Sequence, residues 1–171
     1  MQLLAGDGLA GQMVSVLRQE LDSMVRVIYL LEQAPERRVQ LIEASVHGRK
    51  WSQDGSRRKV SDREMVELAQ FLQGWTQSVY RFGCAFIHLS SLHDYSDRDP
   101  LAQLPAEERR DILEHCRNYH GGPPPGAECF NDLVPFLPRV LEKIAGNLEC
   151  YLVDLETSTH RSSPSPTNPI Q

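Results

Sequence analysis

Cysteine is scarce in this sequence, and the cysteines that are present lie far apart. Cys84, Cys116, Cys129 and Cys150 form no Cys-x-x-Cys pair. Their spacing argues against a zinc ribbon and against a thioredoxin-like redox motif. Reduced thiols are the simplest interpretation, and we expect a cytoplasmic protein.

Long apolar runs are also missing. No stretch reaches the roughly 18 apolar residues that a membrane-spanning helix needs. The first residues, MQLLAGDGLAGQMV, lack the basic start and the apolar run of a signal peptide. The sequence therefore predicts neither secretion nor association with a membrane.

Positive charge is in short supply as well. Lys and Arg total 18 against 23 Asp and Glu, which leaves a formal net charge of -5. This balance argues against a broad basic face for nucleic acid, so a polyanion would have to meet a local cluster. The clearest cluster lies in GRKWSQDGSRRKVSD, which has no apolar period and is predicted to be an exposed connection.

The apolar residues follow a helical pattern rather than a strand pattern. They recur at spacings of three, four and seven in the segments 10–33, 35–48, 61–92, 104–122 and 137–155. We expect a compact antiparallel all-α bundle of about five helices, formed by residues 1–156 as one domain. Residues 157–171 are rich in Ser, Thr and Pro and are predicted to be a disordered tail.

The segment 61–92 is the longest of these predicted helices. Ser61 and Glu64 have the spacing of a capping box, which marks a helix start. Further along, Arg81 and His88 lie seven residues apart, so they share one helix face about two turns apart. Small residues border that face, and a second helix or a ligand can therefore approach it.

An Arg followed by a His at this spacing, on a long helix of a compact bundle, resembles the HEPN superfamily (higher eukaryotes and prokaryotes nucleotide-binding domain). The resemblance covers most of residues 9–156. It implies a metal-independent endoribonuclease without a cofactor, of the kind found among toxins and defence effectors. It also implies a homodimer, and a protein partner such as an antitoxin.

The resemblance gives His88 the role of general acid or base and Arg81 the role of phosphate clamp. Imidazole titrates near neutral pH, and a guanidinium offers paired donors to phosphate oxygens. Ser90, His93 and Tyr95 would support this pair. The residues expected to contact RNA come from the basic cluster: Arg49, Lys50, Trp51, Arg57, Arg58 and Lys59.

Two other pairs in the sequence also have an Arg followed within a few residues by a His. In RDILEH, Arg110 and His115 are five residues apart, which turns them about 140° from each other on an ideal helix. In RNYHGG, only two residues separate Arg117 from His120. We therefore prefer Arg81 and His88 as the catalytic pair.

Two further functions stay open. One is a non-catalytic helical interaction module that binds a partner or a second copy of itself. The other is a metal-dependent hydrolase that uses His88, His93, Asp94, His115 and His120. The histidines of each pair are five residues apart, whereas helical metal pairs are three or four apart. No metal site is therefore predicted.

Overall fold

The computed structural model describes residues 1–72 and 99–161. Within these ranges every regular element is a helix, which confirms the predicted all-α class. The elements are α1 (Gln2–Gly6), α2 (Ala10–Leu31), α3 (Pro35–Val46), α4 (Asp62–Leu72), η1 (Leu101–Gln103), α6 (Ala106–His120), α7 (Phe130–Leu133), η2 (Val134–Phe136) and α8 (Leu137–Arg161).

Four helices match segments that the apolar spacing predicts: α2, α3, α6 and α8. The helix α4 begins where the predicted helix of residues 61–92 begins, and its continuation lies outside the described residues. The short helices α1 and α7 were not predicted, because four or five residues are too few to show a helical period.

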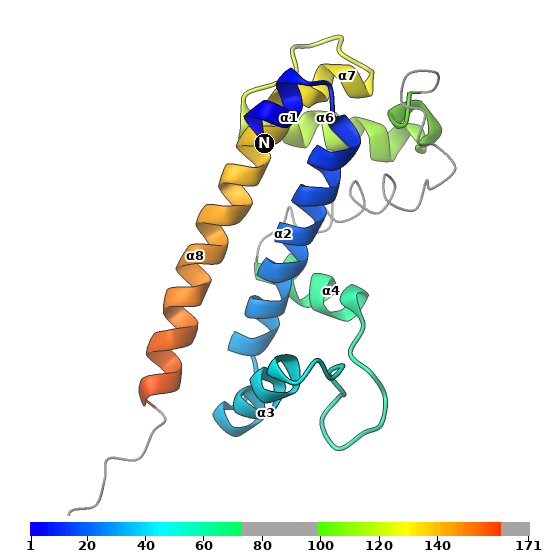
Figure 1. Ribbon diagram of the computed structural model, residues 1–171. Helices are drawn as coiled ribbons and strands as arrows, with labels where there is room; N and C mark the ends of the chain where they lie inside the picture. The colour runs from blue at the N-terminus through cyan, green and yellow to red at the C-terminus, as the bar shows by residue number, and fades with distance from the viewer. Residues whose placement is uncertain (73–98, 162–171) are drawn as a thin grey trace, which may run out of the picture.

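The two longest helices, α2 and α8, lie side by side and run in the same direction (Figure 1). The expectation of an antiparallel bundle was therefore wrong for this central pair. That expectation assumed short connections, which force neighbouring helices to run antiparallel. Here α2 ends at Leu31 and α8 begins at Leu137, so the long intervening chain can return to the first end.

The core lies along α2. Its buried side chains follow the spacing seen in the sequence, and those of α4 and α8 cover them. The fully buried set includes Met13, Leu17, Leu21, Met24 and Ile28 from α2, Ala69 from α4 and Ile144 from α8. In the described ranges, none of the helices combines the length and the apolar character that crossing a membrane requires.

The helix α8 is longer than expected. The predicted tail began at residue 157, whereas α8 continues to Arg161. Ser158 explains part of this difference, because its hydroxyl accepts a hydrogen bond from Arg38 Nη1 at 2.6 Å. The contact joins α8 to α3 and gives the last turns of α8 a tertiary partner.

The capping box predicted at the start of α4 is confirmed. The Ser61 amide donates to Glu64 Oε2 at 2.8 Å, and the Glu64 amide donates to Ser61 Oγ at 3.3 Å. These two bonds satisfy amide groups that have no partner inside the helix.

Replacing Ser61 by alanine is expected to lower the free energy of unfolding by about 1 kcal/mol, because the cap hydroxyl is lost. Urea denaturation followed by far-UV circular dichroism measures the difference. Ser15→Ala is the matched control, since that exposed hydroxyl donates to the Gly11 carbonyl within α2 and caps no helix. Equal stability of Ser61→Ala and Ser15→Ala would contradict a role for the cap.

Candidate anion-binding site

The basic cluster lies in the loop that follows α3. Gly48 has a φ of +65°, which an L side chain rarely adopts, and it turns the chain as the helix ends. The Arg49 amide then donates to the Ala44 carbonyl at 2.7 Å. The chain therefore leaves α3 in a defined direction and passes along the side of this helix.

Trp51 anchors the loop to the core. Only 7% of this residue is exposed, and its indole Nε1 donates to the Leu41 carbonyl at 2.9 Å and to Ser45 Oγ at 2.8 Å. Its ring stacks on Tyr29 with the centroids 5.8 Å apart. The predicted contact of Trp51 with RNA stays a prediction, and the packing of the ring against α2 and α3 leaves little of it exposed for a base.

The two arms of the loop are hydrogen-bonded to each other. The Val60 amide donates to the Trp51 carbonyl at 3.1 Å, and the Gln53 amide donates to the Arg58 carbonyl at 2.8 Å. Gly55 has a φ of +62° in the turn between the arms. The segment is thus exposed as predicted, yet hydrogen bonds between its two arms fix its backbone. We call residues 49–60 the pinned loop.

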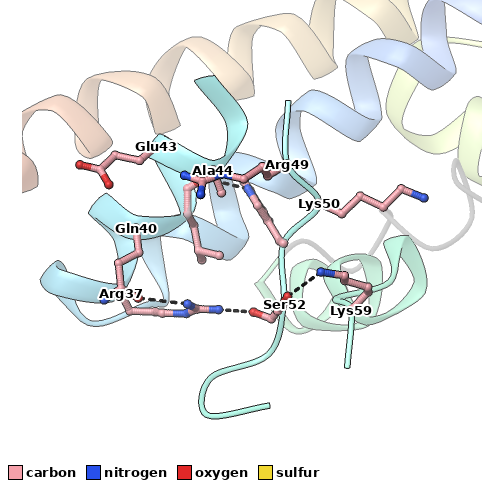
Figure 2. Close-up of a pocket in the computed structure, with 10 residues that line it drawn as sticks. Arg37, Gln40, Glu43, Ala44, Arg49, Lys50, Ser52 and Lys59 are labelled. Carbon is pink, nitrogen blue, oxygen red and sulfur yellow. Dashed lines mark hydrogen bonds between the residues drawn. The ribbon is translucent and has the colours of Figure 1, made fainter. Parts of the chain in front are cut away.

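A hollow of about 670 Å³ lies between α3 and this loop (Figure 2). We call it the basic hollow, because Arg37, Arg49, Lys50 and Lys59 line it, with Glu43 as the single acidic residue among those that the structure describes. Leu41, Ala44 and Trp51 form apolar parts of its wall, and Gln40 and Ser52 add uncharged polar groups.

Two of the cations meet at one residue. Arg37 Nη2 donates to the Ser52 carbonyl, and Lys59 Nζ donates to Ser52 Oγ at 2.9 Å. Arg37 Nη1 also donates to Gln40 Oε1 at 3.1 Å. Figure 2 shows Arg37 and Lys59 approaching Ser52 from opposite sides.

A second hollow of about 410 Å³ adjoins the first and shares Lys50, Trp51 and Lys59 with it. Arg26 and Asp62 also line this hollow, and they form an ion pair at 3.5 Å. The Arg26 guanidinium carbon lies 5.6 Å from the centre of the Trp51 ring. The two hollows therefore form a continuous lining from α3 around Trp51 to the start of α4, with Lys50 and Lys59 shared between them.

The cations of the basic hollow differ from others nearby in their pairing. Arg58 pairs with Glu64 at 3.3 Å, and Arg63 pairs with Glu67 at 2.7 Å. In contrast, no carboxylate among the described residues forms an ion pair with any cation lining the basic hollow. An anionic ligand would therefore not have to displace an ion-paired carboxylate from these cations.

The structure brings together some of the loop residues that the sequence predicts to contact RNA. Arg49, Lys50 and Lys59 line the basic hollow, whereas Arg57 and Arg58 are exposed and outside it. Arg37 was missed. Its signal was present, because Arg37, Gln40 and Ala44 have helical spacing on the segment directly before the basic loop.

The predicted catalytic residues lie outside the described residues. Arg81 and His88 fall in 73–98, as do the supporting residues Ser90, His93 and Tyr95. Their roles stay predictions that rest on the sequence.

The alternative pairs lie on α6, which is continuous from Ala106 to His120. The Arg110 side chain is 63% exposed and lies 3.8 Å from Asp111, while His115 is half-buried. No break in α6 brings Arg110 and His115 to one face, so the separation expected on an ideal helix stands.

The pair Arg117 and His120 makes structural contacts. Arg117 Nε donates to the Pro123 carbonyl at 3.0 Å, and His120 is buried at the end of α6 with its ring centre 5.7 Å from that of His115. Across the part of the chain that the structure describes, no three His, Cys, Asp or Glu residues gather as a metal site would require.

Comparison with known proteins gives this chain no relatives: no family model matches it, and neither a curated protein nor a solved structure resembles it significantly.

Proposed function

We propose that this protein binds RNA at the basic hollow and cleaves it as a HEPN-like, metal-independent endoribonuclease. The observation that supports RNA binding is the group of cations without carboxylate partners, Arg37, Arg49, Lys50 and Lys59, held on one hollow by α3 and the pinned loop. In this proposal the protein acts in the cytoplasm as a homodimer, with the role of a toxin or defence effector.

The charge of the hollow favours a phosphate backbone as ligand. A chain with a net charge of -5 repels polyanions at long range, so binding depends on local cations. Arginine and lysine that neutralise phosphates release bound counterions, which makes RNA affinity fall as salt rises. Cations already paired with carboxylates would gain less from such contacts, because they would exchange one anion for another.

The cleavage step of the proposal rests on the resemblance of the Arg81 and His88 spacing to HEPN proteins. When the 2′-hydroxyl of RNA attacks the adjacent phosphorus, the bond from phosphorus to the 5′-oxygen of the next nucleotide breaks and a 2′,3′-cyclic phosphate forms. His88 would accept the proton of the 2′-hydroxyl as a base or donate a proton to the leaving 5′-oxygen as an acid. Arg81 would stabilise the extra negative charge that develops on the phosphate oxygens. The basic hollow would hold neighbouring phosphates of the strand.

Lys50→Gln is expected to weaken RNA binding regardless of sequence and to reduce the slope of log affinity against log salt by about 0.7, the value for one phosphate contact on a single strand. Fluorescence anisotropy at several salt concentrations measures both effects. Lys143→Gln, which removes the same charge from the exposed face of α8, should leave both unchanged. If the two variants bind alike, the basic hollow is not the RNA site.

His88→Ala is expected to abolish RNA cleavage while RNA binding persists. Gel analysis of a labelled RNA reports cleavage, and circular dichroism with mass measurement of the oligomer checks that the fold is intact. Wild-type protein that binds RNA but never cuts it would end the ribonuclease proposal and keep the binding proposal.

The second candidate function is a non-catalytic helical interaction module. Exposed apolar side chains on α3 and α8 favour it, among them Val46 at 78% and Val153 at 57% exposure. Wild-type protein that neither binds nor cleaves RNA would leave this candidate as the better one.

A further inference from the structure

The two cations that donate hydrogen bonds to Ser52 have further N–H groups with which they can bind a ligand. A guanidinium has five N–H groups and an ammonium has three. Arg37 donates to Gln40 and Ser52, and Lys59 donates to Ser52 Oγ. Both cations keep N–H groups that none of these bonds uses, and both are already held beside the hollow.

The charge balance of the basic hollow exceeds what one internal phosphate requires. Of the residues in 1–72 and 99–161, four cations and one carboxylate line it, which leaves three positive charges in excess. In Figure 2, the Glu43 side chain points away from Arg37 and Lys59. An internal phosphodiester carries one negative charge, whereas a phosphate monoester carries roughly 1.5 to 2 at pH 7. The balance therefore favours the more highly charged group.

The size and lining of the hollow suit the end of a strand. Its volume of about 670 Å³ lies within the roughly 300 to 1,000 Å³ of small-molecule sites. Ala44, which is half-buried, gives it an apolar surface beside the charged groups, which a sugar or base can contact. The adjoining hollow shares Lys50, Trp51 and Lys59, so a strand that ends in the first can continue into the second.

From these observations we infer that the basic hollow is a site for a phosphate monoester, the phosphorylated end of an RNA strand, with Arg37 and Lys59 as its direct ligands. This inference rests on the proposed RNA binding and adds a preference for one kind of RNA end. It concerns binding alone and involves no chemical step.

The test compares RNAs of one sequence that carry a 5′-phosphate, a 3′-phosphate or hydroxyls at both ends. Their binding to the His88→Ala chain is measured by fluorescence anisotropy, so that cleavage does not consume the ligand. One of the phosphorylated strands is expected to bind about tenfold more tightly than the hydroxyl-ended strand, as an added charge-assisted contact predicts.

In the Lys59→Gln variant, the ratio of the affinity for the phosphorylated strand to that for the hydroxyl-ended strand should fall towards 1. The hydroxyl-ended strand should still bind. Arg37→Gln provides a second variant, and thermal melts check that both are folded. Lys143→Gln should keep the full preference, because it removes the same charge from α8. Equal affinity for all three strands in the parent protein would overturn the inference and leave the proposed RNA binding intact.

Measuring the binding of adenosine monophosphate and of adenosine shows whether the site takes the end of an RNA strand or a free nucleotide. If no RNA binds but the monophosphate binds at least tenfold more tightly than adenosine, the monoester site stands and the proposed RNA binding fails. If no RNA binds and the two small molecules bind alike, both proposals fail.

Discussion

Arg38→Ala is expected to lower the free energy of unfolding by about 3 kcal/mol, since several hydrogen bonds to a buried charged group are lost together. Arg38 is only 8% exposed. Its Nε donates to the Leu30 carbonyl at 3.0 Å, and its Nη2 donates to the Leu31 carbonyl at 3.0 Å and to the Gln33 carbonyl at 3.2 Å. The fourth bond reaches Ser158.

The position of Arg38 explains why this loss is large. The last carbonyl groups of any helix have no amide partner within the helix. At the end of α2 the Arg38 guanidinium donates to the Leu31 carbonyl and adds a second donor to the Leu30 carbonyl, and it ties the end of α8 to the same place. Alanine would remove the guanidinium donor from the Leu31 and Gln33 carbonyls, whereas the Leu30 carbonyl would keep its bond from the Gln33 amide at 3.1 Å. It would also release α8 from α3.

Urea denaturation followed by circular dichroism measures the effect. Arg37→Ala is the matched control, because the neighbouring arginine is more exposed and donates to Gln40 and Ser52 instead of to the end of α2. Arg38→Lys tests the geometry, since an ammonium keeps the charge but lacks the planar fork that reaches several carbonyls. A loss for Arg38→Ala no larger than that for Arg37→Ala would refute the structural role.

Mild acid is expected to destabilise the protein through His120. The pKa of this imidazole is lowered from 6.5 to about 4, mainly by burial and also by the positive charges of His115 and Lys143. The unfolded chain then binds a proton between pH 6.5 and 4 that the folded chain does not bind. The free energy of unfolding therefore falls as the pH drops through this window, by about 2 kcal/mol at pH 5.

The surroundings of His120 account for this behaviour. It is the last residue of α6 and is 6% exposed, with the His115 ring on its own helix and Lys143 on α8 nearby. Arg139 Nη1 donates to the His120 carbonyl at 3.2 Å, which adds another cation from α8. The protonated imidazole is thus disfavoured in the folded protein, because burial removes water from the charged ring and because the neighbouring side chains are already positive.

His120→Leu should remove most of this acid sensitivity, because the site no longer takes up a proton on unfolding. Unfolding free energies from urea denaturation at pH 7, 6 and 5 give the comparison. A weaker dependence should persist, since burial also lowers the pKa of His115. His47→Gln, at an exposed histidine, should behave as the parent does. The prediction fails if His120→Leu and the parent lose equal stability between pH 7 and 5.

Much of the candidate site could be predicted from the local amino-acid composition of the sequence. The basic residues of the loop stand out because the rest of the chain is acidic, and three of them do line the hollow. The contribution of Arg37 and the burial of Trp51 were not visible. Both depend on the loop folding back along α3, which follows from hydrogen bonds such as those from the Trp51 indole to Leu41 and Ser45.

The helices and their caps were determined by the sequence itself, because apolar spacing and capping residues act within a few turns of one chain segment. The boundaries of α2 and the Ser61 cap of α4 are of this kind. The parallel course of α2 and α8, and the buried bonds of Arg38, were decided only by the tertiary structure. An apolar stripe specifies which face of a helix is buried, but any helix of suitable shape can cover it. The choice among partners depends on how the whole chain packs.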